Sequence, residues 1–360
     1  MPQDHAIRAM LEALPMPGLV VNQSEVIVGA NAAARNLIGQ RIEGRPYVTM
    51  LRQPALLDAV EACLRQGKTR TAPYLTNDGS QHSTFSVHVA QVMMDKEAPM
   101  VLLSFEDVTQ VQAAGQMRRD FVANVSHELR TPLTALMGFI ETLRGPARND
   151  PAAQARFLGI MQDQAERMNR LVGDLLSLSR VEGDERVRPT TQVNLRECLS
   201  SVMPLMTPLA EESGVTLVAE LGNDPVAVAA DRDQLVQVVS NLIENAIKYG
   251  GKGGKVTLRL EVHDYLRPLR GPGATIVVED DGPGIDPVHL PRLTERFYRA
   301  DNHRSRELGG TGLGLAIVKH IVSRHRGRLR IDSVLGQGTT VQVALPLLAS
   351  EGGGVAQEHS

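Results

Sequence analysis

The 360-residue sequence has no tryptophan, 3% aromatic residues and only two cysteines. Cys63 and Cys198 have neither metal-site spacing nor the pattern of a disulfide framework, so the sequence favours a reducing cytoplasm. No apolar run approaches the roughly 18 to 20 residues that span a bilayer, and the first residues lack the basic-then-apolar order of a signal peptide. These absences indicate a cytosolic protein or the cytosolic part of a longer one.

Neither sign of charge is in large excess, because 38 basic and 41 acidic residues give a net charge of only -3. Bulk attraction to nucleic acid or to an acidic membrane is therefore not expected. The hydrophobic share of 42% is enough for ordinary cores, and the length predicts two or three globular domains.

Residues 14–107 show the pattern of a small α+β module. Short apolar runs at 17–22 and 25–28 predict two strands, and the alanine-rich stretch 31–38 predicts a helix that ends at Gly39. Further strands are predicted around Phe85, Val87 and Val89 and at 100–105. The module, closing on residues 107–109, resembles a PAS sensor domain. No cysteine is placed for a flavin adduct and the histidines lack a haem context, so packing or surface roles are favoured over a chromophore.

An exposed histidine, His127, stands in the stretch 126–132. Apolar residues around His127 recur every three to four positions, which predicts a helix with one apolar stripe. His127 lies on the opposite, wet face, where Glu128 can reach the imidazole, and such a histidine is suited to react or to titrate. Pro132 predicts a kink or loosening. Taken alone, His127 has the alternative reading of an ordinary surface residue. The stripe comprises Val122, Val125, Leu129, Leu133, Leu136, Phe139, Ile140 and Leu143.

A second helix follows a turn at 145–151, with Asp150 as N-cap and Pro151 at the first helical position. Its stripe keeps close to a 3.5-residue spacing. Two helices that share one narrow stripe cannot close a core alone, so we expect a homodimer that forms a four-helix bundle. The polar stretch 111–119 continues into the His127 helix and predicts a mechanical connection to the first module. The second stripe comprises Phe157, Ile160, Met161, Gln164, Met168, Leu171, Leu175 and Leu178.

After residue 183 the pattern changes to an α/β layer. Asp231 caps a helix that buries one face and presents Asn241, Asn245 and Lys248 on its other side. Strands are predicted at 256–262, 274–279, 329–334 and 340–344, giving one helical layer on a mixed sheet. The expected domains are 1–112, 113–183 and 184–349, followed by a flexible tail at 350–360.

Four short motifs follow one another in the last domain. A carboxylate at a strand end, such as Asp280, can accept from the exocyclic amine of adenine. Glycines at 310, 312 and 314 let backbone N–H groups approach phosphate at a helix N-terminus. Asn241 and Asn245 offer oxygens to a hydrated Mg²⁺. Each motif alone is weak, but the four in this order predict an ATP site. The four motifs are residues 280–284, 295–298, 309–315 and 336–339.

These motifs together resemble those of two-component sensor histidine kinases, over about residues 113–346. The H box is 126–132, the N box 241–249, G1 280–284, the F box Phe297 and G2 310–314. The amino-acid sequences of residues 120–132 and 305–320 further resemble those of the phosphate-regulon sensors. The implied fold is multidomain α+β: a PAS-like sensor, a dimeric helical hairpin of the HisKA type, and a GHKL or Bergerat α/β sandwich of the HATPase_c type. Such sensors commonly carry N-terminal membrane helices, which this sequence lacks, so membrane association is left open.

The resemblance implies a role for each matching residue. His127 is the phosphoacceptor, Glu128 its orienting base, and Thr131 belongs to the His-Glu-x-x-Thr phosphatase pattern. Asn245, supported by Asn241, binds Mg²⁺, and Lys248 approaches the phosphates. Residues 299–309 form an ATP lid. The other nucleotide-binding residues are Tyr249, Asp280, Gly282, Gly284, Phe297, Gly310, Thr311, Gly312, Leu313 and Gly314. The implied reaction is autophosphorylation from Mg-ATP and transfer to an aspartate of a response regulator, PhoB-like and of the OmpR class.

Three alternatives compete with this interpretation. One is a sensor kinase of another pathway, and a second is a scaffold whose nucleotide fold only gates conformation. The third is an ATPase of the wider GHKL group, such as a chaperone, although those proteins lack the His-Glu-x-x-Thr hairpin. Thr131 also has an alternative, structural role, because its hydroxyl can donate to a backbone carbonyl and help the helix accommodate the kink at Pro132.

Overall fold

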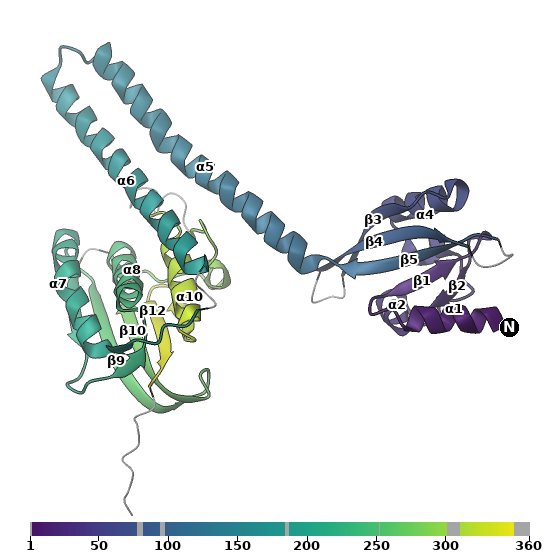
Figure 1. Cartoon of the computed structure of the whole chain (residues 1–360). Coiled ribbons are helices and arrows are strands. Elements are labelled where there is room, and N and C mark those ends of the chain that lie inside the picture. Colours follow the sequence, from purple (N-terminus) through teal and green to yellow (C-terminus); the bar gives the residue numbers. More distant parts are fainter. Residues whose placement is uncertain are drawn as a thin grey trace, which may run out of the picture. The chain divides into compact units, whose positions relative to one another are not determined.

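The computed structural model describes residues 2–77, 82–93, 98–183, 187–251, 253–300 and 310–348. The chain divides into two compact units, residues 1–123 and 124–360 (Figure 1). Among the helices of the described ranges, none has the length and apolarity needed to cross a bilayer. The expected tail at 350–360 lies outside the described residues.

The first unit is built on a five-stranded antiparallel sheet in the order β2-β1-β5-β4-β3. The strands are β1 (Gly18–Val21), β2 (Ile27–Ala30), β3 (Arg70–Asn77), β4 (His82–Val92) and β5 (Met100–Asp107). The predicted strands are thus confirmed. Phe85, Val87 and Val89 are buried, as their alternation with polar residues required.

Helices lie on both faces of this sheet. Leu19 and Val21 point into the main core, under α2 (Ala32–Ile38), α3 (Tyr47–Leu51) and α4 (Pro54–Gln66). Val20 points the other way, into a smaller cluster with residues of α1 (Pro2–Glu12). The sequence pattern did not predict α1, which covers the second face.

The helical hairpin consists of α5 (Thr109–Arg144) and α6 (Pro151–Gly183). The predicted cap is confirmed, because Asp150 Oδ1 accepts from the backbone N–H groups of Ala152 and Ala153 at 3.1 and 3.0 Å. Helix α5 is continuous from the first unit into the second and runs through Pro132 without interruption. The proline therefore does not end the helix.

The predicted apolar stripe of α5 is only partly covered within one chain, which agrees with the expectation that two helices cannot close a core alone. Val122 is 57% exposed and Leu133 is 50% exposed. Because a hairpin of two helices provides too little surface to cover both stripes, this face lacks a partner inside the monomer.

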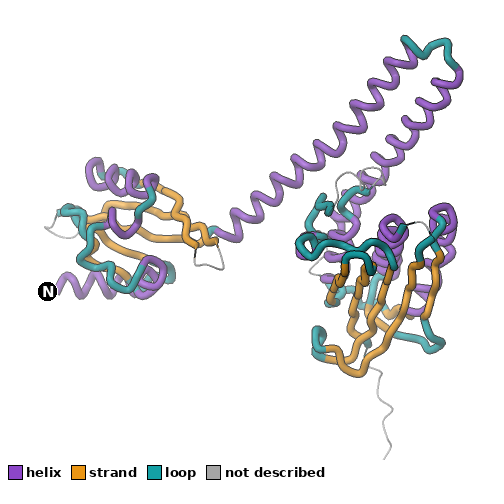
Figure 2. Tube along the Cα trace, turned by 180° about the vertical axis from the view of Figure 1, so that it is seen from behind, coloured by secondary structure: helices purple, strands orange, loops and turns teal. Residues whose placement is uncertain are grey.

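The rest of the second unit is a mixed sheet with one helical layer, as predicted (Figure 2). The strand order is β11-β12-β10-β9-β7, and β7 runs parallel to β9 while the other pairs are antiparallel. The strands are β7 (Thr216–Glu220), β9 (Lys255–Leu266), β10 (Gly271–Asp280), β11 (Arg328–Val334) and β12 (Gly338–Pro346). The helices are α7 (Leu195–Ser213), α8 (Arg232–Gly250) and α10 (Gly314–Arg324), with the 3-10 turn η1 (Leu290–Arg292). A separate two-stranded sheet pairs β6 (Gln192–Asn194) with β8 (Ala227–Ala229).

Candidate functional site

His127 lies on α5 with its side chain exposed to solvent, as predicted. Glu128 is half-buried, and its described partners are not the imidazole. Its Oε2 accepts from Arg167 of α6 at 3.4 Å and from Arg299, beyond the F box, at 3.2 Å. A carboxylate between two guanidinium groups is held in place, so in this arrangement Glu128 is directed toward the arginines.

Thr131 follows His127 by one helical turn and is also exposed. Its hydroxyl donates to the backbone carbonyl of His127 at 3.2 Å. This is the structural role that the sequence left open for Thr131. The same hydroxyl remains accessible on the face that carries the histidine.

Helix α8 places the predicted N-box residues along one side. Asp231 caps the helix by accepting from the backbone N–H of Gln234 at 3.2 Å. Its apolar face is buried as predicted, which leaves the half-buried Asn241 and Asn245 one turn apart on the other side. The Asn241 Nδ2 atom is buried without a hydrogen-bond partner in the described part of the chain. A buried amide without a partner indicates a place for a polar ligand.

The N-terminus of α8 is held by a histidine that the sequence did not single out. His325 is 1% exposed, and its Nδ1 lies 2.7 Å from the carbonyl oxygen of Ile321. Because a carbonyl only accepts, Nδ1 carries the proton and Nε2 accepts from the backbone N–H of Asp231 at 3.0 Å. Burial lowers the pKa of His325. A neutral imidazole therefore fixes the start of the helix that carries both asparagines.

Lys248 and Tyr249 lie at the C-terminal end of α8, both half-buried. The Lys248 ammonium is paired with Glu244, one turn earlier on the same helix. A neighbouring carboxylate of the same helix therefore already engages the cation that was predicted to approach the phosphates.

The strand end predicted to recognise a base is tightly built. Asp280 closes β10, and its Oδ1 accepts from the backbone N–H of Gly282 at 3.0 Å. Burial raises the pKa of Asp280, while hydrogen bonds from the backbone of Gly282 and Thr339 act in the opposite direction. A Cβ on Gly282 would lie 2.7 Å from the Cα of Gly250. The loop 280–284 therefore packs directly on the end of α8.

Gly284 has a φ of +69°, and a Cβ there would lie 2.1 Å from the carbonyl oxygen of Val334. Only glycine fits this conformation and this contact. The final hairpin turn is joined to the same loop by a hydrogen bond from the Gly336 N–H to the Pro283 carbonyl at 2.7 Å. The structure thus brings together the first and last of the four motifs.

The other two motifs also meet. The backbone N–H of Phe297 donates to the Gly312 carbonyl at 2.8 Å, and both residues have positive φ, 63° and 72°. Gly310, Thr311 and Gly312 precede the buried Leu313, and α10 begins at Gly314 beside Asn241. Glycines at a helix N-terminus suit an anion, as predicted. Residues 301–309 of the predicted lid lie outside the described residues.

Sequence reasoning missed Arg167 and Asp174 around this site, and it placed Arg299 only at the start of the predicted lid. Asp174 of α6 accepts from the Thr311 hydroxyl at 2.7 Å. Arg299 has a side chain only 6% exposed. These contacts join α5, α6 and the glycine-rich loops over separations of 39 to 171 residues, and no local pattern signals them.

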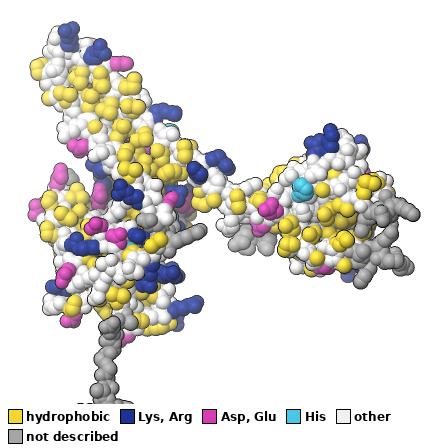
Figure 3. All heavy atoms as spheres, in the orientation of Figure 1, with side chains coloured by type: hydrophobic (Ala, Val, Ile, Leu, Met, Phe, Trp, Pro, Cys, Tyr) yellow, Lys and Arg dark blue, Asp and Glu magenta, His cyan; other side chains and the backbone are white. Residues whose placement is uncertain are grey.

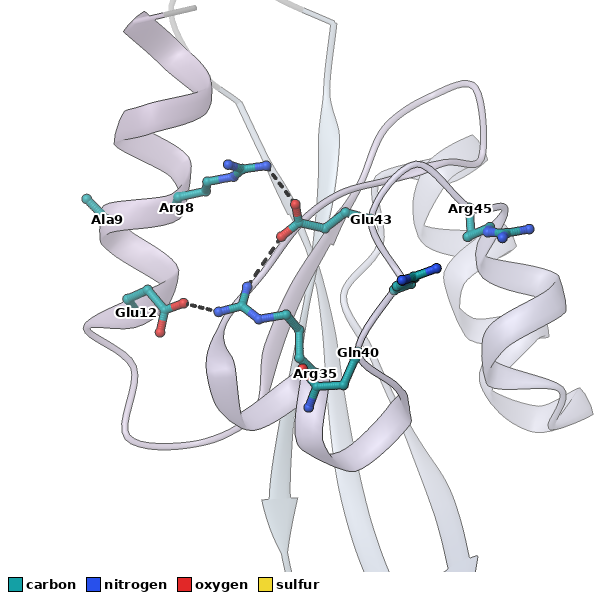
Figure 4. A pocket seen from close by; sticks show the side chains of 8 residues that line it. Arg8, Ala9, Glu12, Arg35, Gln40, Glu43 and Arg45 are labelled. Carbon is teal, nitrogen blue, oxygen red and sulfur yellow. Dashed lines mark hydrogen bonds and ion pairs between the residues drawn. The ribbon is translucent and has the colours of Figure 1, made fainter.

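The first unit contains a separate pocket between α1, α2 and the residues that follow α2 (Figure 4). Glu43 is paired with Arg8 at 2.6 Å and with Arg35 at 3.4 Å, and Arg35 also meets Glu12 at 2.6 Å. These alternating charges connect α1 to α2 and to the segment that follows α2. None of these charged residues was predicted to bind the nucleotide.

Comparison with known proteins gives two family matches. Residues 230–349 match the histidine kinase-, DNA gyrase B- and HSP90-like ATPase family, and residues 117–184 match the His Kinase A (phospho-acceptor) domain. The first covers the glycine-rich motifs and α8, and the second covers His127. The motifs predicted from the sequence therefore lie within the residues that match these two families.

Two curated relatives extend these matches. The chain is 37% identical over 314 residues to the phosphate regulon sensor protein PhoR of Pseudomonas aeruginosa, covering 86% of this chain and 67% of that protein. It is 39% identical over 240 residues to the sensor histidine kinase WalK of Bacillus subtilis, covering 67% of this chain and 38% of that protein. The chain thus spans about two thirds of the first relative and well under half of the second.

Among solved structures, the histidine kinase ThkA in complex with the response regulator protein TrrA has the same fold. The TM-score is 0.51 at 22% identity, with 94% of this chain and 97% of that chain covered. Family matches on both sides of the site, together with a relative that aligns with most of the chain, settle the assignment: this chain belongs to the sensor histidine kinases and is PhoR-like.

Proposed function

We propose that this chain transfers the γ-phosphoryl group of ATP to His127 and then to an aspartate of a response regulator. The observation that carries the proposal is that two pairs of motifs, 280–284 with 336–339 and Phe297 with 310–314, each lie against α8, in the same compact unit as an exposed histidine. A surface histidine alone would support no such reaction.

In this proposal, the adenine amine donates to Asp280, and the backbone N–H groups of 310–314 receive the phosphates at the start of α10. Asn245 and Asn241 hold Mg²⁺, which neutralises phosphate charge during transfer. The buried Asn241 Nδ2, a donor without a described partner, fits an accepting oxygen such as that of a phosphate at this position. Tyr249, Gly282, Gly284 and Leu313 shape the site by packing, and Lys248 adds positive charge.

His127 acts as the nucleophile, because a neutral imidazole has a free lone pair near pH 7. Glu128 orients it by accepting the proton of the other ring nitrogen. In the arrangement described above, Glu128 instead meets Arg167 and Arg299. Transfer therefore requires these contacts to be exchanged, which assigns the described arrangement to a resting form.

The test is incubation of the full chain with γ-labelled ATP and Mg²⁺. We expect acid-labile, alkali-stable label in the wild type, and none in His127→Gln, whose ATP affinity should stay near that of the wild type. Asn245→Ala should lose both the label and Mg²⁺-dependent ATP binding. Retained label in His127→Gln contradicts the assignment, and free phosphate without labelled protein indicates an ATPase of the wider group.

We further propose that Thr131 takes part in dephosphorylating the regulator. Its hydroxyl lies one turn beyond His127 on the exposed face and can position a water for attack on an acyl phosphate. Thr131→Ala should keep autophosphorylation but slow phosphate loss from a prelabelled regulator. Equal rates in the two proteins would leave Thr131 only its bond to the His127 carbonyl.

The regulator is proposed to be PhoB-like, of the OmpR class, and to act in phosphate-starvation signalling. The support is the 37% identity to PhoR over most of the chain. A PAS-like sensor at 1–112 is proposed from the α+β sheet of the first unit, with a hairpin at 113–183 and an ATP-binding domain at 184–349. A cytoplasmic location agrees with two buried, free cysteines. Phosphotransfer to a purified PhoB-like regulator within seconds, compared with an unrelated one, tests the partner.

A further inference from the structure

A carboxylate of the helical hairpin lies in the corner of the ATP-binding domain where phosphates are expected. Asp174 of α6 accepts a hydrogen bond from the Thr311 hydroxyl at 2.7 Å. Thr311 belongs to the glycine-rich run 310–314 at the start of α10. The two residues are 137 positions apart in the sequence, so packing of α6 on this domain creates the contact.

Charged residues of α8 act on the same carboxyl group. Burial raises the pKa of Asp174 and Glu244 adds to that rise, whereas the Thr311 hydrogen bond, Lys248 and Arg170 lower it. Lys248 itself is paired with Glu244. A hydroxyl that donates and a nearby ammonium are the surroundings that also suit a phosphoryl oxygen. Asp174 thus occupies a position with the chemistry of a phosphate site.

A phosphate cannot share this position with Asp174. Thr311 has one hydroxyl proton, which points to Asp174, while its oxygen accepts from the Leu313 N–H at 3.3 Å. Lys248 and Arg170 balance the charges of Asp174 and Glu244, but an ionised Asp174 held against the Thr311 hydroxyl still meets a phosphoryl oxygen at that position as a like charge. Entry of the triphosphate therefore requires Asp174 to leave or to lose its charge.

We propose that Asp174 is an internal competitor of the nucleotide's phosphates, so that a triphosphate releases α6 from the ATP-binding domain. The inference rests on the proposed ATP site and deepens it by naming how that site is regulated. Release of α6 would also separate Arg299 from Glu128, which are 3.2 Å apart in the docked arrangement. Nucleotide entry is thereby coupled to the freeing of the carboxylate next to His127.

The first test compares ATP with adenosine, which has no phosphates to compete. In calorimetry on the full chain with Mg²⁺, Asp174→Asn should bind ATP about tenfold more tightly than the wild type, because a larger fraction is competent to bind. Its affinity for adenosine should change less than twofold. Asp163→Asn is the matched control, since Asp163 is an exposed carboxylate on the same helix, and it should leave both affinities unchanged.

Unchanged ATP affinity in Asp174→Asn overturns the inference while the proposed function stands. An equal gain for ATP and adenosine also overturns it, because the effect would then not act through phosphate. Failure of both wild type and variant to bind ATP overturns the proposed function itself.

A second test locks the docked arrangement without altering Asp174. Ser177 of α6 and Gln237 of α8 share hydrogen bonds of 2.8 and 3.0 Å, so Ser177→Cys with Gln237→Cys places two thiols across the same contact. The oxidised protein should bind ATP at least about tenfold more weakly than the reduced protein, with adenosine binding unchanged. Equal ATP affinities before and after reduction contradict the competition.

Discussion

His325 shows how one buried residue connects the protein's stability to pH. Its neutral ring bridges the Ile321 carbonyl and the Asp231 N–H, and burial is the first cause of its lowered pKa, with Arg324 and Arg188 acting in the same direction and Asp231 opposing. The unfolded chain therefore takes up a proton at a higher pH than the folded chain. The resulting stability is fully present above the ordinary value of about 6.5 and is lost as the pH falls below it.

We expect the free energy of unfolding to fall between pH 7.5 and 5.5 by more in the wild type than in His325→Gln. Glutamine can donate and accept but does not titrate, and at pH 7.5 the substitution should cost about 1 to 3 kcal/mol through imperfect hydrogen bonds. Urea unfolding at both pH values measures the difference. Parallel losses in the two proteins would assign the pH dependence to other groups.

At the scale of elements, the candidate site depends on close packing between the loop 280–284 and the turn that joins β11 to β12. Gly284 combines a φ of +69° with a Cβ position 2.1 Å from the Val334 carbonyl oxygen. Gly284→Ala must therefore move the loop 280–284 away from the β11–β12 turn, at a cost of at least about 1 kcal/mol for the φ alone. We expect weaker ATP binding together with a lower unfolding midpoint.

Gly159 of α6 is the matched control for that substitution. A Cβ there meets nothing within 4 Å, and alanine is a better helix former than glycine by up to about 1 kcal/mol. Gly159→Ala should raise the midpoint and leave ATP binding unchanged, as measured by calorimetry and thermal unfolding. If Gly159→Ala also lost ATP binding, the loss in Gly284→Ala could not be assigned to the loop 280–284.

The elements themselves were largely predictable, because their signals are local. The Asp231 cap, the face of α8 and the alternation in β4 each follow from side chains a few positions apart. The same reasoning could not find the Asp174–Thr311 or Glu128–Arg299 contacts, which depend on how α6 and α5 meet the ATP-binding domain. Periodicity did identify the apolar face of α5, but it does not by itself show what covers that face.

At the scale of the whole molecule, the hairpin presents an apolar surface, seen as hydrophobic atoms along α5 and α6 in Figure 3. Its exposed apolar residues include Leu133, Met137 and Ile140 on α5 and Val172 and Leu176 on α6. A contiguous apolar face of this kind marks an interaction surface. These exposed apolar residues on both helices suit a second copy of the hairpin, which would complete a four-helix bundle.

We therefore expect the full chain to be a dimer at micromolar concentration, and Leu133→Glu with Met137→Glu to shift it to monomer, because two carboxylates per chain would be buried without partners. Light scattering measures the mass directly. Leu205→Glu is the control, since Leu205 on α7 is also exposed, at 61%, but lies outside the hairpin. A wild type that is monomeric, or a Leu205 variant that dissociates equally, would contradict a dimer formed through the hairpin.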